Sequence, residues 1–238
     1  IIDDEQSGSS VLLSKIIHAF IELHKNETVK ASVLPGLLEE LQEAFPQFAM
    51  IQHFLSYLKK AIYGNVFHLE AAVLSYKKKW EHDIEDTADL FDQYLEAYPQ
   101  RMMVHSNSGF LQSTCKKLQE EGKISELVQS VSWPAAEGVL QAHALEEYMN
   151  IVIIPDTRMA AEMAKVDMLL LGADVIAADY FINKAGSFAA CLAAKYYDVP
   201  VYVIAGARKR IEEMEIPESV YNALISEHPK PAGELLES

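Results

Sequence analysis

The segment VDMLLLGADVIAADYFINKAG (Val166–Gly186) carries more information about the fold than any other part of this chain. It begins with an apolar run, Val166–Leu171, which is typical of a buried strand in a parallel sheet. Asp174 follows the run at the carboxyl end of the predicted strand, and Asn183 and Lys184 come just before the next helical segment. Ligands of open α/β sheets bind at the carboxyl ends of strands and at helix N-termini. The segment therefore predicts a crevice that these three side chains face together.

The three side chains suit a particular kind of ligand. A carboxylate accepts hydrogen bonds from hydroxyl groups, whereas an ammonium group, an amide and a helix N-terminus all bind phosphate. The sequence therefore predicts a small phosphorylated polyol as the ligand. Two of these residues also have an alternative that involves no ligand, since Asp174 can cap a turn and Lys184 can be a solvated surface lysine.

Outward from this segment, residues 99–238 alternate between strand-like and helical stretches. The strand-like runs are Met102–His105, Glu126–Val131, Asn150–Ile154, Val166–Leu171 and Val199–Ile204. The helical stretches between them are Gly109–Glu121, Ala135–Met149, Thr157–Ala164 and Ser187–Tyr197. Strict alternation with short connections predicts an α/β domain with a doubly wound, Rossmann-like parallel sheet.

Residues 1–98 show helical periodicity and almost no strand pattern. Ser9 and Ser10 precede an apolar stripe at helical spacing, and Pro46 opens a later helix. A single long helix is expected from about residue 67 to about residue 97, ending before Pro99. The chain is thus expected to consist of an all-helical N-terminal domain, residues 1–98, followed by the Rossmann-like domain, residues 99–238.

Composition excludes several classes of function. The chain has 20 Lys and Arg against 35 Asp and Glu, a net charge of −15, which argues against a nucleic-acid or membrane surface. Its two cysteines, Cys115 and Cys191, form neither a disulfide framework nor a zinc pattern, and a dinucleotide fingerprint and a Walker motif are absent, so no cofactor or metal is expected. The first residues do not resemble a signal peptide, and no apolar run reaches transmembrane length. A soluble cytoplasmic protein is expected.

Polar loops follow the other predicted strands. The loop after the first strand contains Ser106, Asn107, Ser108 and Gly109, and its backbone N–H groups can bind an anion at the start of the next helix. His105 ends an apolar strand and is better interpreted as a core histidine with satisfied hydrogen bonds than as a base. Trp133, at the end of the second strand, can serve either as a binding platform or as a plug.

Several of these motifs resemble the initiation factor 2B superfamily. The most specific match is Gly172-Ala173-Asp174 with Asn183-Lys184-x-Gly186; the others are Gln6-Ser7-Gly8-Ser9, Val104-His105-Ser106-Asn107-Ser108-Gly109 and Ser132-Trp133-Pro134. The superfamily contains the α, β and δ regulatory subunits of eukaryotic initiation factor 2B and isomerases of methylthioribose-1-phosphate and ribose-1,5-bisphosphate. The resemblance implies a helical domain joined to a Rossmann-like domain, and a homodimer or hetero-oligomer formed through the C-terminal domain.

The chain departs from the isomerases of this superfamily at three positions. They carry a cysteine where this chain has Ser106, paired with the aspartate that matches Asp174. A serine hydroxyl is a far poorer acid than a thiol, whose pKa is about 8.5. They also carry arginines where this chain has Trp133 and Ser7, and an arginine binds phosphate through two parallel hydrogen bonds.

These departures favour a protein related to initiation factor 2B without efficient isomerase activity, which binds a sugar phosphate or nucleotide in the crevice as a regulatory or assembly subunit. The alternative is an aldose–ketose isomerase acting on a phosphorylated pentose, with Asp174 as general acid/base and Ser106 as hydrogen-bond donor. A dinucleotide-dependent oxidoreductase is disfavoured because the glycine fingerprint is missing.

A phosphate in this crevice needs a cation to offset the missing arginines. Arg158 follows the third predicted strand, and Arg208 follows the fifth and begins an Arg-Lys-Arg cluster. Of the two, Arg208 is the preferred candidate, because consecutive cations at a strand end are unusual in so acidic a chain. The alternative is that the cluster is the solvated start of a helix.

Overall fold

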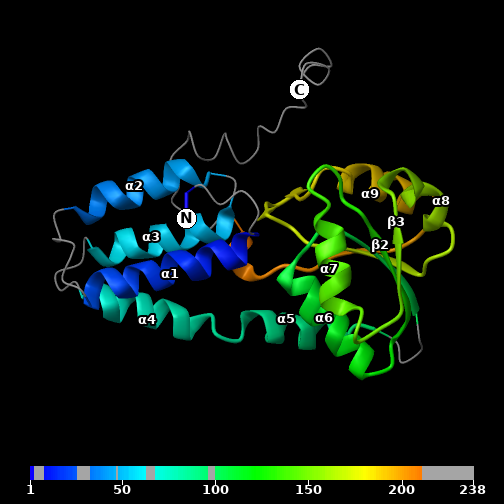
Figure 1. The fold of residues 1–238 in the computed structure, drawn as a ribbon, viewed down its shortest axis with the longest axis horizontal. Coiled ribbons are helices and arrows are strands. Elements are labelled where there is room, and N and C mark those ends of the chain that lie inside the picture. The colour runs from blue at the N-terminus through cyan, green and yellow to red at the C-terminus, as the bar shows by residue number, and fades with distance from the viewer. Residues whose placement is uncertain (3–7, 26–32, 47, 63–67, 96–99, 211–238) are drawn as a thin grey trace, which may run out of the picture.

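The computed structural model describes residues 1–238 except 3–7, 26–32, 47, 63–67, 96–99 and 211–238. Its N-terminal half is helical. The helices are α1 (Ser9–Lys25), α2 (Leu34–Ala44), α3 (Ala49–Ile62), α4 (Leu69–Lys79) and α5 (Asp83–Asp92). The first four pack together at one end of the molecule, and α5 extends from them to lie along the α/β half (Figure 1). None of the helices in the described ranges is long and apolar enough to cross a membrane.

A five-stranded parallel sheet forms the C-terminal half. The strands are β1 (Gln100–His105), β2 (Ile124–Ser130), β3 (Ile151–Ile154), β4 (Met168–Leu171) and β7 (Val201–Val203). Their order is β3-β2-β1-β4-β7, and every neighbouring pair is parallel. The strand order therefore reverses between β1 and β4, and the crevice outside such a reversal is where open α/β sheets bind ligands.

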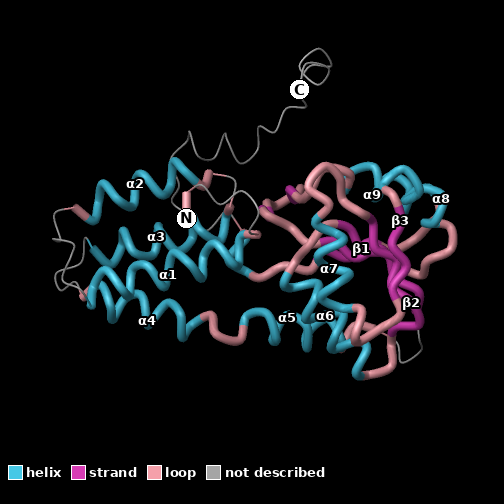
Figure 2. Tube along the Cα trace, viewed as in Figure 1, coloured by secondary structure: helices cyan, strands magenta, loops and turns pink. Residues whose placement is uncertain are grey.

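Helices cover both faces of this sheet (Figure 2). They are α6 (Gly109–Glu120), α7 (Glu137–Leu145), α8 (Met159–Met163) and α9 (Ser187–Tyr196), with short 3-10 helices η1 (Asp156–Arg158) and η2 (Ala207–Lys209). Alternate residues of β1 enter two different cores. Met102 and Val104 join α6, whereas Met103 joins α8 and α9. This period of two shows that both sheet faces are buried, as the continuous apolar runs predict.

The larger core is continuous between the two halves. It includes Phe54 and Tyr76 of the helical half together with Met102 and Leu170 of the sheet, all buried. Because one core joins the two halves, the helical half packs directly against the α/β half, chiefly through α5 on α6.

Two local expectations were wrong. The single helix expected between residues 67 and 97 is two helices, because α4 ends at Lys79 after three lysines and α5 begins at Asp83 with an acidic first turn. Basic residues favour a helix C-terminus and acidic residues an N-terminus, so the break is electrostatically favourable. Between β4 and α9 the chain forms a short antiparallel hairpin, β5 (Val175–Ile176) with β6 (Phe181–Ile182), where a turn was expected.

Candidate functional site

A polar crevice of about 200 Å³ lies at the point where the strand order reverses. The last residue pair of β1 and β4 joins His105 to Leu171, so the loops that follow these two strands lie side by side. The crevice is lined by Gly8, Ser9, Ser10, Val11, Ser106, Asn107, Ser108, Gly109, Gln112, Gly172, Ala173, Asp174, Asn183 and Lys209. The structure thus brings together Asp174, Asn183 and the loop after β1, as the sequence predicts.

Ser106 has a positive φ of 72°, which is uncommon for a residue other than glycine. Its backbone N–H donates to Oγ of Ser132 at 2.7 Å, and its carbonyl oxygen accepts from Nε2 of Gln129 at 3.2 Å. These two hydrogen bonds hold the strained backbone in place. Such strain persists only where the surroundings enforce it and is commonest at functional sites.

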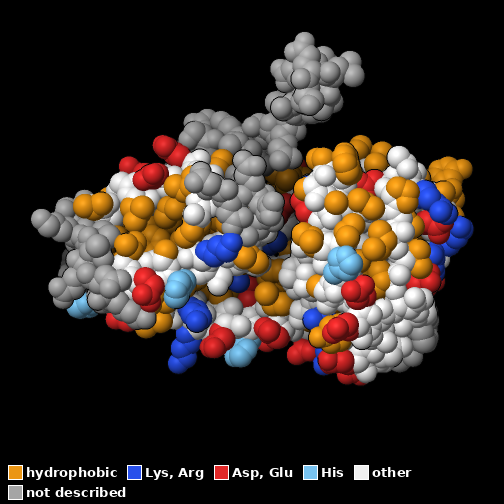
Figure 3. Space-filling view, in the orientation of Figure 1, with side chains coloured by type: hydrophobic (Ala, Val, Ile, Leu, Met, Phe, Trp, Pro, Cys, Tyr) orange, Lys and Arg blue, Asp and Glu red, His pale blue; other side chains and the backbone are white. Residues whose placement is uncertain are grey.

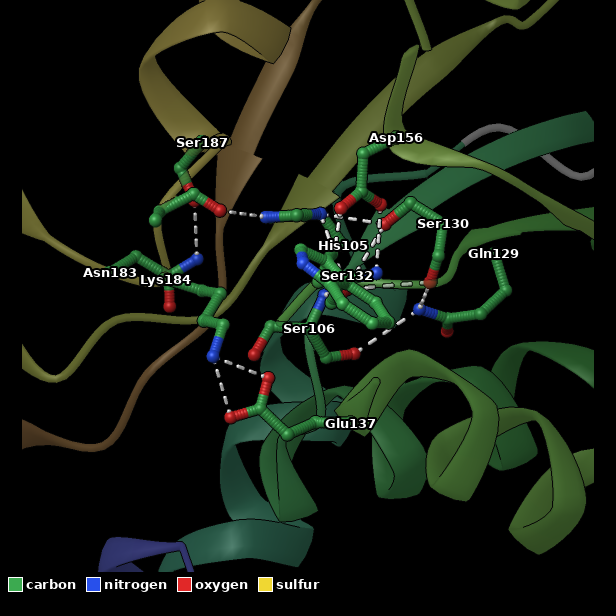
Figure 4. A network of polar contacts seen from close by, with 12 residues as sticks. His105, Ser106, Gln129, Ser130, Ser132, Glu137, Asp156, Asn183, Lys184 and Ser187 are labelled. Atoms are coloured by element: carbon green, nitrogen blue, oxygen red, sulfur yellow. Dashed lines mark hydrogen bonds and ion pairs between the residues drawn. The ribbon is translucent and has the colours of Figure 1, made fainter. Parts of the chain in front are cut away.

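His105 is a fully buried core histidine, as the sequence predicts. Its Nε2 donates to the carbonyl oxygen of Ala185 at 2.8 Å, so in the neutral ring Nδ1 accepts from the hydroxyl of Ser130 at 2.6 Å (Figure 4). Burial lowers the pKa of His105, which favours this neutral form. Both ring nitrogens are engaged, so His105 connects the β1 loop to the segment before α9.

Trp133 does not line the crevice. Its side chain is 69% exposed, so it neither fills the crevice nor stacks inside it. Asp156 at the end of β3 orients this loop, because its two carboxylate oxygens accept from the backbone N–H groups of Ser132 and Trp133, each at 2.7 Å. The expected position of Trp133 beside the ligand is therefore not seen.

Lys184 lies outside the set of residues that line the crevice. Its Nζ is 2.8 Å from both carboxylate oxygens of Glu137, at the start of α7 (Figure 4). Asn183 does line the crevice, and its amide donates to Oγ of Ser187 at 2.8 Å. Lys184 would have to leave Glu137 to reach a ligand in the crevice.

Arg158 and Arg208 were the candidates for a cation beside the phosphate, but both pair with carboxylates outside the crevice. Arg158 is exposed and pairs with the buried carboxylate of Glu162 at 2.8 Å. Arg208 is buried in the helical half, where Nε and Nη2 donate to Oδ2 of Asp83 at 3.1 and 3.0 Å. Its guanidinium lies 5.2 Å from the ring centroid of Trp80. Arg208 therefore points away from the crevice, and it is not a solvated residue either.

Sequence reasoning missed Lys209, the middle residue of the same cluster. Its side chain is 5% exposed, and Nζ donates to the carbonyl oxygen of Ala173 at the edge of the crevice. Burial lowers the pKa of Lys209, while the carboxylate of Asp174 acts in the opposite direction. The basic cluster was visible in the sequence, but which of its members faces the crevice depends on the tertiary structure.

The start of α1 also belongs to the crevice, although the sequence did not predict it there. The carbonyl oxygen of Gly8 accepts from the backbone N–H groups of Val11 and Leu12 at 3.0 and 3.1 Å, and Gly8, Ser9 and Ser10 line the crevice. The N-terminus of this 17-residue helix is therefore beside Asp174 and Lys209. Gln6 and Ser7 of the same motif lie outside the described residues.

The crevice offers both hydrogen-bond acceptors and donors. Asp174 supplies a carboxylate, Lys209 an ammonium group, and the helices α1 and α6 begin at its edge. Two backbone N–H groups of the β1 loop are already engaged, that of Ser106 as above and that of Ser108 with Gln141 at 2.8 Å. Within the described ranges, no three His, Cys, Asp or Glu side chains come together as metal ligands would. The chemistry suits a small polar ligand that carries hydroxyl groups and an anionic group.

Together, the fold and the crevice define a class of protein: a helical N-terminal half joined to a Rossmann-like sheet, with a polar site at the strand reversal. The chain belongs to the initiation factor 2 subunit family, whose profile matches residues 9–228.

Known proteins similar to this chain carry two kinds of name. A putative translation initiation factor eIF-2B subunit 2-like protein of Pyrococcus furiosus is 26% identical over 207 residues, which are 85% of this chain and 74% of that protein. A ribose 1,5-bisphosphate isomerase of Archaeoglobus fulgidus is 36% identical over 110 residues, 45% of this chain and 35% of that protein. The family therefore includes both initiation-factor-like proteins and sugar-phosphate isomerases.

Solved structures show the same fold. The translation initiation factor eIF-2B of Pyrococcus horikoshii OT3 superposes with a TM-score of 0.79 at 23% identity, over 90% of this chain and 78% of that one. A chain of the tetrameric eIF2B-beta2-delta2 complex from C. thermophilum gives a TM-score of 0.71 at 13% identity, over 92% of this chain and 77% of that one. The helical half followed by the sheet is thus the arrangement of known eIF-2B structures.

Proposed function

We propose that the crevice binds a sugar phosphate or nucleotide and that the protein acts as a regulatory or assembly subunit without efficient isomerase activity. One observation carries the binding part. Asp174, Asn183 and the start of α6 face one crevice of about 200 Å³ at the reversal of strand order. Hydroxyl groups suit the carboxylate, and a phosphate suits the starts of α1 and α6.

The non-catalytic part rests on Ser106. This residue lines the crevice together with Asp174, at the position where the resemblance places the cysteine of the isomerases. A hydroxyl group donates a proton far less readily than a thiol, and a positioned acid/base group contributes about 10²–10⁴ in rate. The site therefore keeps groups that bind a polyol, while the group that would move the proton is replaced.

The second candidate is an aldose–ketose isomerase acting on a phosphorylated pentose. Asp174 favours it, because a carboxylate beside a buried ammonium group is a sound arrangement for moving protons. Asp174 would then serve as general acid/base and Ser106 as hydrogen-bond donor. This candidate predicts turnover, whereas the first predicts binding alone.

A thermal-shift screen followed by a turnover assay tests the proposal. Ribose 1,5-bisphosphate, methylthioribose 1-phosphate and adenosine monophosphate are compared with ribose and adenosine, which lack the phosphate. Stabilisation by a phosphorylated compound, lost in Asp174→Asn, together with turnover at least about 10²-fold below ordinary isomerase rates, is the expected result. No stabilisation by any of them would refute the binding function.

We also propose that the protein associates with a second copy, or with a related subunit, through the α/β half. Phe188, Leu192 and Tyr196 recur every four residues on α9, and all three side chains are exposed. Hydrophobic side chains gather on the visible surface around α8 and α9 (Figure 3). A large exposed apolar stripe marks an interaction surface.

Sedimentation equilibrium tests this association. The wild type is expected to be a dimer that Leu192→Glu converts to a monomer, because a buried charge without a partner opposes association. A wild type that is monomeric up to high concentration would exclude the homodimer. A related subunit would then be the remaining candidate for the partner that covers α9.

A further inference from the structure

Two fully buried glutamines adjoin the loop after β1, and the proposed binding function, on which this inference rests, assigns them no role. Gln129 belongs to β2 and Gln141 to α7, and neither lines the crevice. A buried amide is costly unless its oxygen and its NH2 group are hydrogen-bonded. The partners of the two amides therefore indicate their role.

The two side chains connect two backbone groups of the loop after β1. The N–H of Ser108 donates to Oε1 of Gln141 at 2.8 Å. Nε2 of Gln141 donates to Oε1 of Gln129 at 2.9 Å. Nε2 of Gln129 in turn donates to the carbonyl oxygen of Ser106 at 3.2 Å (Figure 4). Two hydrogen-bonded amides thus bridge the groups on either side of Asn107, which lines the crevice.

The hydrogen bonds allow each amide one orientation only. A backbone N–H can only donate, so Gln141 must present its oxygen to Ser108 and its NH2 group to Gln129. Gln129 then keeps its NH2 group for carbonyl oxygens, that of Ser106 and, at 2.9 Å, that of Ser130. Because donors and acceptors alternate correctly from end to end, the two amides form one bridge that depends on both of them.

Gly138 brings α7 close enough for this bridge to form. A Cβ atom on Gly138 would lie 1.8 Å from the carbonyl oxygen of Ser130 and 2.6 Å from Nε2 of Gln129, so only a glycine allows α7 to approach the end of β2 this closely. Residues three apart share one face of a helix, and Gln141 follows Gly138 at this spacing. The close approach therefore places the amide of Gln141 beside that of Gln129.

We propose that Gln129 and Gln141 are positioning residues, which hold the loop after β1 in the shape that the ligand requires without touching the ligand. Ser106 has a φ of 72°, which a serine adopts only where its surroundings enforce it. Ser132 holds the N–H of Ser106 at 2.7 Å, and Gln129 holds its carbonyl oxygen. Without the bridge the loop relaxes, and only a fraction of the molecules present the loop that binds the ligand.

Isothermal titration of the full chain with ribose 5-phosphate compares Gln141→Met with Gln52→Met. Gln52 is a matched control, because it is fully buried in the helical half and its Nε2 donates to the carbonyl oxygens of Gln42 and Phe45 at 3.0 and 2.8 Å. Both variants lose buried hydrogen bonds and should lose similar stability in urea denaturation. We expect only Gln141→Met to bind ribose 5-phosphate more weakly, by about 5- to 150-fold, which corresponds to the roughly 1–3 kcal/mol of a strained backbone conformation.

The double variant Gln129→Met/Gln141→Met keeps the test decisive if the single variant folds poorly, because it leaves neither amide without its partner. Since the two amides form one bridge, the double variant should bind ribose 5-phosphate about as weakly as Gln141→Met. Wild-type affinity in either variant, or an equal loss of affinity in Gln52→Met, overturns the inference alone. Absence of ribose 5-phosphate binding by the wild type overturns the proposed function together with it.

Discussion

Asp83→Asn should destabilise the protein strongly, although Asp83 lies far from the sheet in sequence. Its carboxylate accepts two hydrogen bonds from Arg208, and the two side chains are 9% and 8% exposed. Trp80 and Tyr76 surround the guanidinium, with ring centroids 5.2 and 6.0 Å away. The substitution therefore removes the carboxylate that pairs with this buried guanidinium and leaves its positive charge buried.

Removing one partner of a buried ion pair costs about 3–5 kcal/mol. For a chain of this size, each kcal/mol lowers the melting temperature by roughly 2–4 °C, so a fall of roughly 6–20 °C is expected. Urea denaturation followed by circular dichroism measures the free energy of unfolding directly. In Asp83→Asn/Arg208→Met most of the loss should be recovered, because an apolar side chain of similar length replaces the unpaired charge.

Asp86→Asn is the matched control. Asp86 lies in the same acidic first turn of α5 but is exposed, so it shares the interaction with the helix dipole and lacks the buried pair. Its loss should be about 0.3–1 kcal/mol. If Asp83→Asn costs no more than Asp86→Asn, the buried pair does not stabilise the packing of η2 against the helical half.

Two further predictions concern the frame of the crevice. In Gly138→Ala the new Cβ would lie 1.8 Å from the carbonyl oxygen of Ser130. The free energy of unfolding, measured by urea denaturation, should therefore fall by roughly 1–3 kcal/mol or more. Gly36→Ala is the control, because its Cβ would enter open space, and this substitution should be neutral or stabilising. Equal effects would contradict the tight contact. Burial lowers the pKa of His105, so the unfolded state takes up more protons as the pH falls through about 6.5, and folding stability falls with it. His105→Gln should show a smaller loss of stability between pH 8 and pH 5, and an unchanged loss would mean that His105 titrates normally.

The fold could be predicted because its signals are local. Apolar runs such as Met168–Leu171 are hydrophobic on both faces, and this pattern specifies a parallel sheet whichever partners the strands choose. The break between α4 and α5 was also visible in the sequence, in the lysines of Lys77–Lys79 followed by the acidic residues from Asp83. Apolar residues continue at helical spacing through this region, and for this reason the sequence pattern predicted one long helix instead of two.

The candidate site could be predicted only in part. Ser106 and Asp174 lie in the loops after the neighbouring strands β1 and β4, and Asn183 lies shortly before α9, so the topology brings them to one crevice. Cations cannot be placed in this way, because a long side chain turns to whichever partner the tertiary structure provides. Lys184 pairs with Glu137 on α7, and Arg208 pairs with Asp83, which lies 125 residues earlier in the chain. The sequence alone does not identify either of these partners.

The crevice is proposed to bind a sugar phosphate without converting it. Phosphorus NMR of ribose 1,5-bisphosphate mixed with the wild-type protein tests both halves in one sample, because binding broadens or shifts the resonances and isomerisation replaces them. The prediction is a saturable change that disappears in Asp174→Asn, with no new product resonance over hours. Product appearing at an ordinary enzyme rate would contradict the non-catalytic function, and unchanged resonances at saturating protein would contradict binding.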